Sequence, residues 1–158
     1  MNQNNDIEVV WRPDVTVAAI VPREGRFLVV EERIRGELVL NQPAGHLEPG
    51  ESLAHAAERE TLEETGWTVE LTELIGIYQW TRPDDGWQVL RVTFAARAVS
   101  HDPFRSLDAG IERALWLTRA EIAAARVRSP LVLRNIDDWK SGRRLPLDAL
   151  HNVVGSGI

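Results

Sequence analysis

A charged segment between Pro49-Gly50 and Gly66 constrains this chain more than any other feature of its sequence. Ser52 is a typical N-cap residue, and glycine at position 66 suits the left-handed residue that often follows a helix. We therefore predict a helix over residues 53–65. Its apolar residues share one face that would pack on a sheet: Leu53, Ala56 and Ala57.

The same helix carries acidic side chains at helical spacing. Glu60, Glu63 and Glu64 are three or four residues apart or adjacent, so their carboxylates can converge on one side of the helix. Like charges at these spacings repel each other, and a divalent cation would offset that repulsion. Taken alone, such a cluster is more often a solvated acidic surface, with Arg59 and Glu63 as an i,i+4 ion pair.

Around this helix, short apolar runs alternate with turn residues, which indicates strands. We expect strands over residues 15–21, 26–32, 38–40, 67–71, 74–80, 89–98 and 114–117, and helices over 119–125 and 131–139. The first two strands would form a hairpin across residues 22–25, and residues 41–45 and 82–86 would be turns. This order predicts an α/β fold of the α+β kind, an α/β/α sandwich with one mixed sheet between helices.

The chain has 158 residues, the size of one domain. We expect a flexible tail at residues 1–10, because residues 2–6 lack apolar periodicity, and a single domain over 11–158. No run of 18 apolar residues occurs, so we expect no membrane span. The net charge of −6 argues against a nucleic-acid partner. The absence of cysteine leaves oxygen and imidazole as metal ligands and favours a cytoplasmic protein.

The segment 45–67 resembles the Nudix box, G-x5-E-x7-R-E-u-x-E-E-x-G-u, in which u is a bulky apolar residue. Its seven specified positions are matched by Gly45, Glu51, Arg59, Glu60, Glu63, Glu64 and Gly66. If each match has a probability of roughly one in fifteen, chance agreement is on the order of 10^-8 per start position. Thr61 and Trp67 occupy the u positions, and they bear on how the helix packs more than on the chemistry.

Segments outside the box, over most of residues 13–148, resemble the NudJ-type phosphatase branch of the Nudix family, for example NQPAGHLE and SGRRLPL. The resemblance implies a Nudix-type sandwich with a catalytic loop-helix-loop. It also implies Mg²⁺-dependent hydrolysis, with Mn²⁺ as a substitute, of nucleoside tri- or diphosphates or of small organic pyrophosphates such as hydroxymethylpyrimidine pyrophosphate. Other substrates that it leaves open are dinucleotide polyphosphates and nucleotide sugars, and a non-catalytic nucleotide sensor is a further alternative. The partner would be a small phosphorylated molecule, and the protein a monomer or homodimer.

The resemblance also implies roles for single residues. The metal ligands would be Glu60, Glu63, Glu64 and the main-chain carbonyl of Gly45. Arg59 would orient the carboxylates, and Glu51 would tie the loop to the helix. Gly45 and Gly66 would supply backbone freedom at the two ends of the motif. The general base would be Glu63 or Glu112, although Glu112 is equally compatible with an ordinary surface glutamate.

Residues that bind substrate are indicated only weakly. Arg33 and Arg35 follow the second strand and could contact terminal phosphates, or they could be solvated loop arginines. His46 could touch phosphate, and a structural hydrogen bond is the plainer interpretation. Trp80 could stack on a heterocycle, as could Trp87 and Tyr78, or these aromatic rings could simply pack beside a turn.

Overall fold

The computed structural model describes residues 11–153, so the tail expected at residues 1–10 lies outside the described residues. The elements in chain order are β1 (Asp14–Ile20), β2 (Pro22–Arg23), β3 (Arg26–Ile34), β4 (Glu37–Asn41), β5 (Ala44–His46), α1 (Leu53–Thr65), β6 (Trp67–Thr81), β7 (Gln88–His101), β8 (Ile111–Thr118), α2 (Arg119–Ala124), α3 (Leu131–Lys140) and the short 3-10 helix η1 (Leu147–Ala149). Within the described part of the chain, no helix is long and apolar enough to cross a membrane.

Within residues 11–153, eight strands form two sheets instead of the single sheet that we expected. The first has the strand order β5-β1-β7-β6, and it is mixed because β1 and β7 run parallel while the other pairs are antiparallel. The second is antiparallel, with β3 paired to β2, β4 and β8. The predicted mixed sheet is confirmed, and the additional sheet is the correction.

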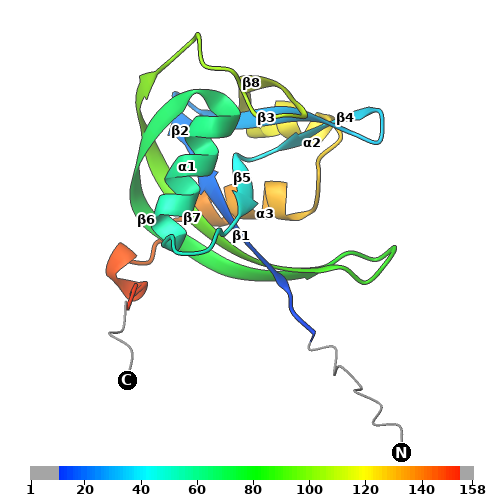
Figure 1. Cartoon of the computed structure of the whole chain (residues 1–158). Helices are drawn as coiled ribbons and strands as arrows, with labels where there is room; N and C mark the ends of the chain where they lie inside the picture. Colours follow the sequence, from blue (N-terminus) through cyan, green and yellow to red (C-terminus); the bar gives the residue numbers. More distant parts are fainter. Residues whose placement is uncertain (1–10, 154–158) are drawn as a thin grey trace, which may run out of the picture.

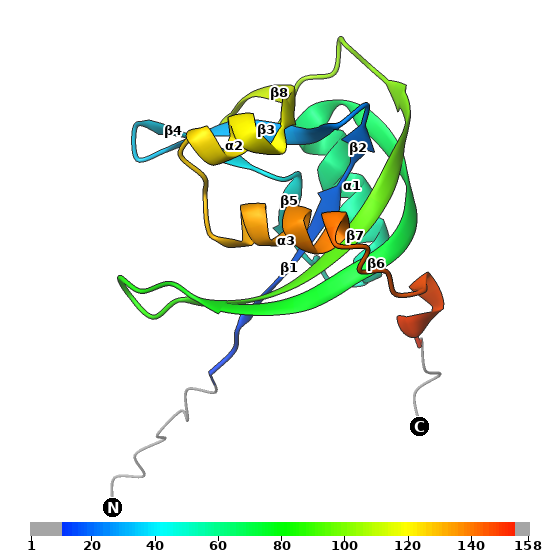
Figure 2. The same cartoon turned by 180° about the vertical axis from the view of Figure 1, so that it is seen from behind.

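Helices cover the sheets from both sides. Helix α1 lies in front of the strands in Figure 1, and α2 and α3 lie in front when the molecule is seen from behind in Figure 2. Neighbouring residues of β1 pack into two different hydrophobic cores. Ala19 belongs to the core under α1, and Ile20 belongs to the core under α2 and α3. This period-two division of apolar side chains is what an α/β/α sandwich requires.

Helix α1 has the predicted bounds and the predicted caps. The Ser52 hydroxyl accepts a hydrogen bond from the backbone N–H of His55 at 3.1 Å, and Gly66 has the left-handed φ of 71°. Ala56 and Ala57 are fully buried against the sheet. Thr61 is buried as well, and its hydroxyl donates to the carbonyl of Ala57 at 2.7 Å, so its polar atom is paired inside the helix.

Two details of the strand pattern differ from expectation. The strand that begins the fold does not pair with β3, because the chain passes at Val21 from the mixed sheet into the second sheet, where only β2 forms the hairpin. The strands expected at 67–71 and 74–80 are one strand, β6, whose pairing with β7 shifts register three times. β-Bulges therefore take the place of the expected break. The turn expected at 41–45 is shorter, since β5 begins at Ala44.

Candidate active site

The guanidinium of Arg59 organises the residues at the outer side of α1. It donates to both carboxylate oxygens of Glu51 at 2.8 and 3.0 Å, to Glu60 at 2.8 Å and to Glu63 at 3.0 Å. It also donates to the carbonyl of His46 at 3.0 Å. A second contact holds the loop before the helix, because the N–H of Glu48 donates to Glu51 at 2.7 Å. The positively charged guanidinium of Arg59 thus joins the loop to the helix.

Strand β5 lies directly against the carboxylate of Glu60. A Cβ atom built on Gly45 would lie 2.1 Å from the Glu60 Cδ and 2.2 Å from both carboxylate oxygens. Gly45 has no positive φ, whereas Gly66 does. The expectation that both glycines supply backbone freedom is therefore correct for Gly66 and wrong for Gly45, where the absence of a side chain is what matters.

Three carboxylates approach one another at this end of the helix. Glu60, Glu63 and Asp108 each offer an oxygen atom, and these atoms lie within 4.8 Å of one another. Asp108 belongs to the loop before β8, and its backbone N–H donates to the carbonyl of Glu63 at 3.1 Å. This hydrogen bond explains why a residue far along the chain is held beside the helix.

Glu64 lies deeper than the other carboxylates. It accepts a hydrogen bond from the backbone N–H of Ala44 at 2.9 Å, which joins α1 to β5. Burial raises its pKa to about 8, and the charges of Glu60, Glu32 and Asp108 act in the same direction. Burial also raises the pKa of Glu60, against the opposing effect of Arg59.

The chemistry of these donors fits a divalent cation. The groups that converge are carboxylate oxygens, and hard cations such as Mg²⁺ prefer oxygen ligands. Burial and neighbouring carboxylates raise the pKa values of Glu60 and Glu64, and a bound cation would favour their charged forms. Of the residues expected to bind the metal, Glu60 and Glu63 belong to this group of converging carboxylates, whereas Glu64 does not.

Glu112 is placed differently from the box carboxylates. Its side chain is 44% exposed, and its carboxylate accepts a hydrogen bond from Arg33 Nε at 2.7 Å. Arg33 also donates to the carbonyl of Gly36 at 3.2 Å. The structure therefore pairs two of the residues proposed from the sequence with each other, and it brings Asp108 to the carboxylate cluster instead.

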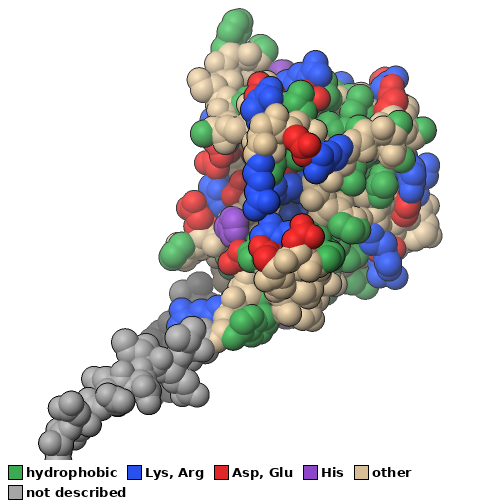
Figure 3. Space-filling model, turned by 90° about the vertical axis from the view of Figure 1, so that its right-hand side faces the viewer, with side chains coloured by type: hydrophobic (Ala, Val, Ile, Leu, Met, Phe, Trp, Pro, Cys, Tyr) green, Lys and Arg blue, Asp and Glu red, His purple; other side chains and the backbone are tan. Residues whose placement is uncertain are grey.

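A cavity of about 200 Å³ adjoins Gly45 and His46, on the side of β5 that faces β3, β4 and β7. Its polar and aromatic lining is formed by Thr16, Glu32, Asn41, His46, Trp80, Trp87, Arg91, Arg128 and Ser129. Trp80, Trp87 and Arg128 also line a wider groove that contains Arg35. Figure 3 looks onto the side from which the β3–β4 and β6–β7 hairpins project, and basic side chains gather there around a hollow.

The residues proposed for substrate binding therefore separate into two groups. His46 and Trp80 line the cavity, and Arg35 lies at the adjoining groove, whereas Arg33 is engaged with Glu112. The Trp87 indole N–H donates to Asp14 at 2.6 Å, which fixes that ring. The Tyr78 hydroxyl donates to Asp138 at 2.9 Å, so Tyr78 packs against α3 instead of facing the cavity.

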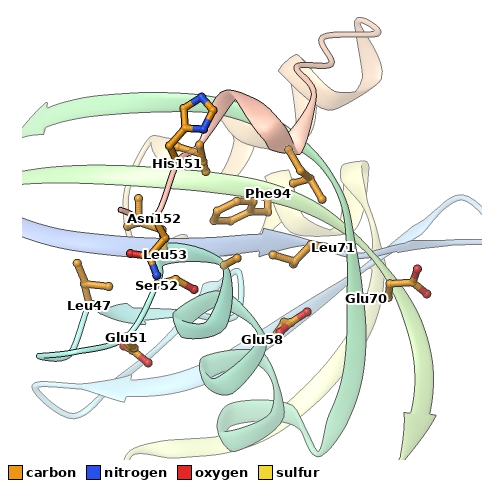
Figure 4. A pocket seen from close by; sticks show the side chains of 13 residues that line it. Leu47, Glu51, Ser52, Leu53, Glu58, Glu70, Leu71, Phe94, His151 and Asn152 are labelled. Atoms are coloured by element: carbon orange, nitrogen blue, oxygen red, sulfur yellow. The ribbon is translucent and has the colours of Figure 1, made fainter. Parts of the chain in front are cut away.

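A larger cavity of about 440 Å³ lies between the first turn of α1, strand β6 and the segment around η1. Figure 4 shows its apolar side chains, among them Leu53, Leu71 and Phe94, with Glu70 at the margin. Glu51 reaches its edge, but that carboxylate is paired with Arg59. We place the active site at the smaller cavity because it is lined by Gly45, which lies against the carboxylate of Glu60, and by the charged side chains of Glu32 and Arg91.

Sequence reasoning missed four residues of this site: Glu32, Arg91, Asp108 and Arg128. Two of them had a detectable signal. Glu32 continues the alternation of Leu28 and Val30 on one face of β3, and Arg91 is a charged residue within the apolar run of β7. Asp108 and Arg128 lie in loops without any periodic pattern, so only the fold could place them.

Comparisons with known proteins agree with the fold. Residues 10–136 match the family described as NUDIX domain. Phosphatase NudJ of Escherichia coli (strain K12) is 43% identical over 142 residues, which cover 89% of this chain and 92% of that protein. The solved NUDIX hydrolase from Nitrosomonas europaea has a TM-score of 0.89 and 49% identity, covering 92% of this chain and 100% of that chain. The NUDIX domain of Shewanella oneidensis NrtR, solved with ADP ribose, shows the same fold with a TM-score of 0.69 and 17% identity, covering 88% and 94%.

Proposed function

Because this chain belongs to the Nudix hydrolase family and is an enzyme acting on phosphorus-containing anhydrides, we propose that it is Mg²⁺-dependent and releases phosphate from small substrates. The substrates would be nucleoside tri- and diphosphates or small organic pyrophosphates such as hydroxymethylpyrimidine pyrophosphate. Mn²⁺ would substitute for Mg²⁺. The extensive similarity to a protein named as a phosphatase supports this choice over dinucleotide polyphosphates and nucleotide sugars.

The observation that carries the proposal is the convergence of carboxylates beside Gly45. Glu60 and Glu63, which converge with Asp108, would hold the cation, and Glu64 and the main-chain carbonyl of Gly45 would be its further ligands. When bound, the cation would neutralise phosphate oxygens and lower the pKa of a water molecule. Arg59 holds Glu60 and Glu63 in place through charge-assisted hydrogen bonds.

The chain offers three candidates for the group that accepts the proton of the attacking water. Glu63 remains the first, because it lies on α1 within the cluster. Asp108 joins it as a new candidate, since its position is fixed by its own backbone hydrogen bond. Glu112 is the third, and its ion pair with Arg33 would have to open before it could act. A general base contributes about 10²–10⁴-fold to a rate.

The test is a phosphate-release assay in Mg²⁺ with nucleoside tri- and diphosphates, hydroxymethylpyrimidine pyrophosphate, diadenosine polyphosphates and nucleotide sugars. We expect nucleoside triphosphates, nucleoside diphosphates and hydroxymethylpyrimidine pyrophosphate to react. The variant Glu63→Gln should lower turnover by at least about 10²-fold without changing the fold. Glu58→Gln is the matched control, because Glu58 is an exposed glutamate on the same helix. Turnover of diadenosine polyphosphates or nucleotide sugars alone would contradict the proposed substrate class.

A further inference from the structure

The cavity beside Gly45 contains buried polar atoms that no group in residues 11–153 pairs. Arg91 is only 8% exposed, yet its Nη1 lacks a hydrogen-bond partner, and its Nε is 3.3 Å from the hydroxyl of Thr16. Asn41 is 6% exposed and its Oδ1 is likewise unpaired. The third atom is Glu32 Oε1, on a side chain 15% exposed. Burial raises the pKa of Glu32 against the smaller, opposing effect of a side-chain hydrogen bond with Asn41, but Oε1 itself has no partner. All three residues line the same cavity.

Unpaired buried polar atoms are rare in folded proteins, and each needs an explanation. Arg128 is the nearest cation to Glu32, but its Nε lies 4.0 Å from Oε1, beyond hydrogen-bond distance. The positive charge of Arg91 is only partly stabilised by its surroundings. Burial lowers its pKa to about 10, although the nearby carboxylates of Glu32 and Glu64 act to raise it. A ligand that pairs these atoms would recover hydrogen bonds that the free protein lacks.

The unpaired atoms specify what such a ligand must present. Glu32 Oε1 and Asn41 Oδ1 are acceptors, whereas Arg91 Nη1 is a donor. Their complement is a group with two N–H donors next to an acceptor. A heterocycle with an exocyclic amino group beside a ring nitrogen has this pattern, and a carboxylate side chain is a known acceptor for the amino group of cytosine. An oxo group at the same position would instead face two acceptors.

The walls of the cavity suit a flat ring. Trp80 and Trp87 line it, with their rings 6.2 Å apart at 83°, and aromatic faces bind heterocycles by stacking. The cavity also reaches Gly45, which touches the carboxylate of Glu60. A ring bound there could extend a phosphate chain toward the carboxylate cluster.

We propose that this cavity selects substrates with an amino-substituted heterocycle, with Glu32 and Asn41 accepting from the amino group and Arg91 donating to the neighbouring ring atom. The inference rests on the proposed function and names the substrate class of the same site. It makes Glu32, Asn41 and Arg91 the residues that determine specificity.

The test measures binding separately from turnover. Cytidine and uridine differ by an amino or oxo group at one ring position, so their methylene-bridged diphosphate analogues form a matched pair that the enzyme does not cleave at the bridge. Binding in Mg²⁺ can be followed by intrinsic tryptophan fluorescence, because two of the six tryptophans, Trp80 and Trp87, line the cavity. We expect the cytidine analogue to bind at least about tenfold more tightly, as one hydrogen bond to a charged group implies. Equal affinities, or tighter binding of uridine, would overturn the proposal.

The variant Glu32→Gln replaces a carboxylate by an amide of the same shape, which can donate to an oxo group. Its cytidine-to-uridine affinity ratio should fall toward one. Glu31→Gln is the matched control, because Glu31 is the preceding residue of β3 and pairs with Arg113 at 2.8 Å. It should keep the wild-type ratio. An unchanged ratio in folded Glu32→Gln would exclude Glu32 as the amino acceptor. If Glu32→Gln fails to fold, the wild-type comparison decides alone.

Turnover of the ordinary nucleotides, measured in parallel, keeps this inference distinct from the proposed function. Hydrolysis of cytidine and uridine triphosphates with equal kcat/KM would contradict the selectivity while leaving the hydrolase intact. Selective binding of the cytidine analogue without any phosphate release from the triphosphates would support the selectivity and contradict the proposed hydrolase activity.

Discussion

The contact between Gly45 and Glu60 allows a sharp test of the metal site. In Gly45→Ala, the new Cβ would lie 2.1 Å from the Glu60 Cδ, whereas ordinary contact begins at 3.4 Å. The carboxylate must therefore move by the difference, about 1.3 Å. A misplacement of about 1 Å in an active site can cost 10²-fold in rate, so we expect Mg²⁺-dependent turnover to fall by about 10²-fold.

The fold should tolerate the same substitution. The atoms in conflict are the far end of a flexible side chain, and Gly45 does not need a positive φ. Replacing glycine by alanine also restricts the unfolded chain, which stabilises a protein by about 0.4–1 kcal/mol where the backbone allows it. We expect the Tm in EDTA to stay within a few degrees of wild type, while the stabilisation by added Mg²⁺ is reduced.

A double-mutant cycle tests the reasoning itself. If Gly45→Ala acts by displacing Glu60, it should have little further effect on turnover in a Glu60→Ala background. The reasoning is refuted if Gly45→Ala keeps wild-type turnover, or if it lowers the rate of Glu60→Ala by the same factor as that of wild type. Steady-state phosphate release in Mg²⁺ and thermal unfolding in EDTA provide both measurements.

Further predictions concern the carboxylates and the helix. Burial raises the pKa of Glu64 from 4.5 to about 8, so its proton is bound more tightly in the folded protein; its contribution to stability is present below about pH 4.5 and is lost as the pH rises to about 8. In EDTA, Glu64→Gln should thus be more stable than wild type at pH 9 but not at pH 4, which urea denaturation would measure; equal stability at pH 9 would contradict the shift. Asp108→Asn should lower kcat by at least tenfold while Glu112→Gln leaves it nearly unchanged, and the reverse order in the phosphate-release assay would restore Glu112 as the base. Thr61→Val should change the free energy of unfolding by less than about 1.5 kcal/mol, because the lost hydroxyl is paired only within its own helix; a larger loss in urea denaturation would show that this hydrogen bond matters more.

Much of the fold was predictable from local sequence signals. Ser52 and Gly66 mark the ends of α1 because caps depend on residues within a few positions. Thr118 likewise starts α2 in a capping box with Glu121. The longer strands were found at nearly their observed positions, since alternation of apolar residues needs no distant partner. The short strands β2 and β5 were missed, because they begin in segments expected to be turns. The division of the strands into two sheets was not predicted, because a strand shows the same alternation of apolar residues whichever sheet it joins.

The site divides in the same way. The order of residues within the Nudix box by itself determined that Arg59, Glu60, Glu63 and Glu64 share one helix beside a glycine loop, because helical spacing places them together in any fold. Only the tertiary structure decided that Asp108 approaches Glu63, that Glu112 is occupied by Arg33, and that Glu32, Asn41 and Arg91 meet in one cavity. These contacts join residues far apart in the chain, so they depend on strand pairing and packing, which no local pattern encodes.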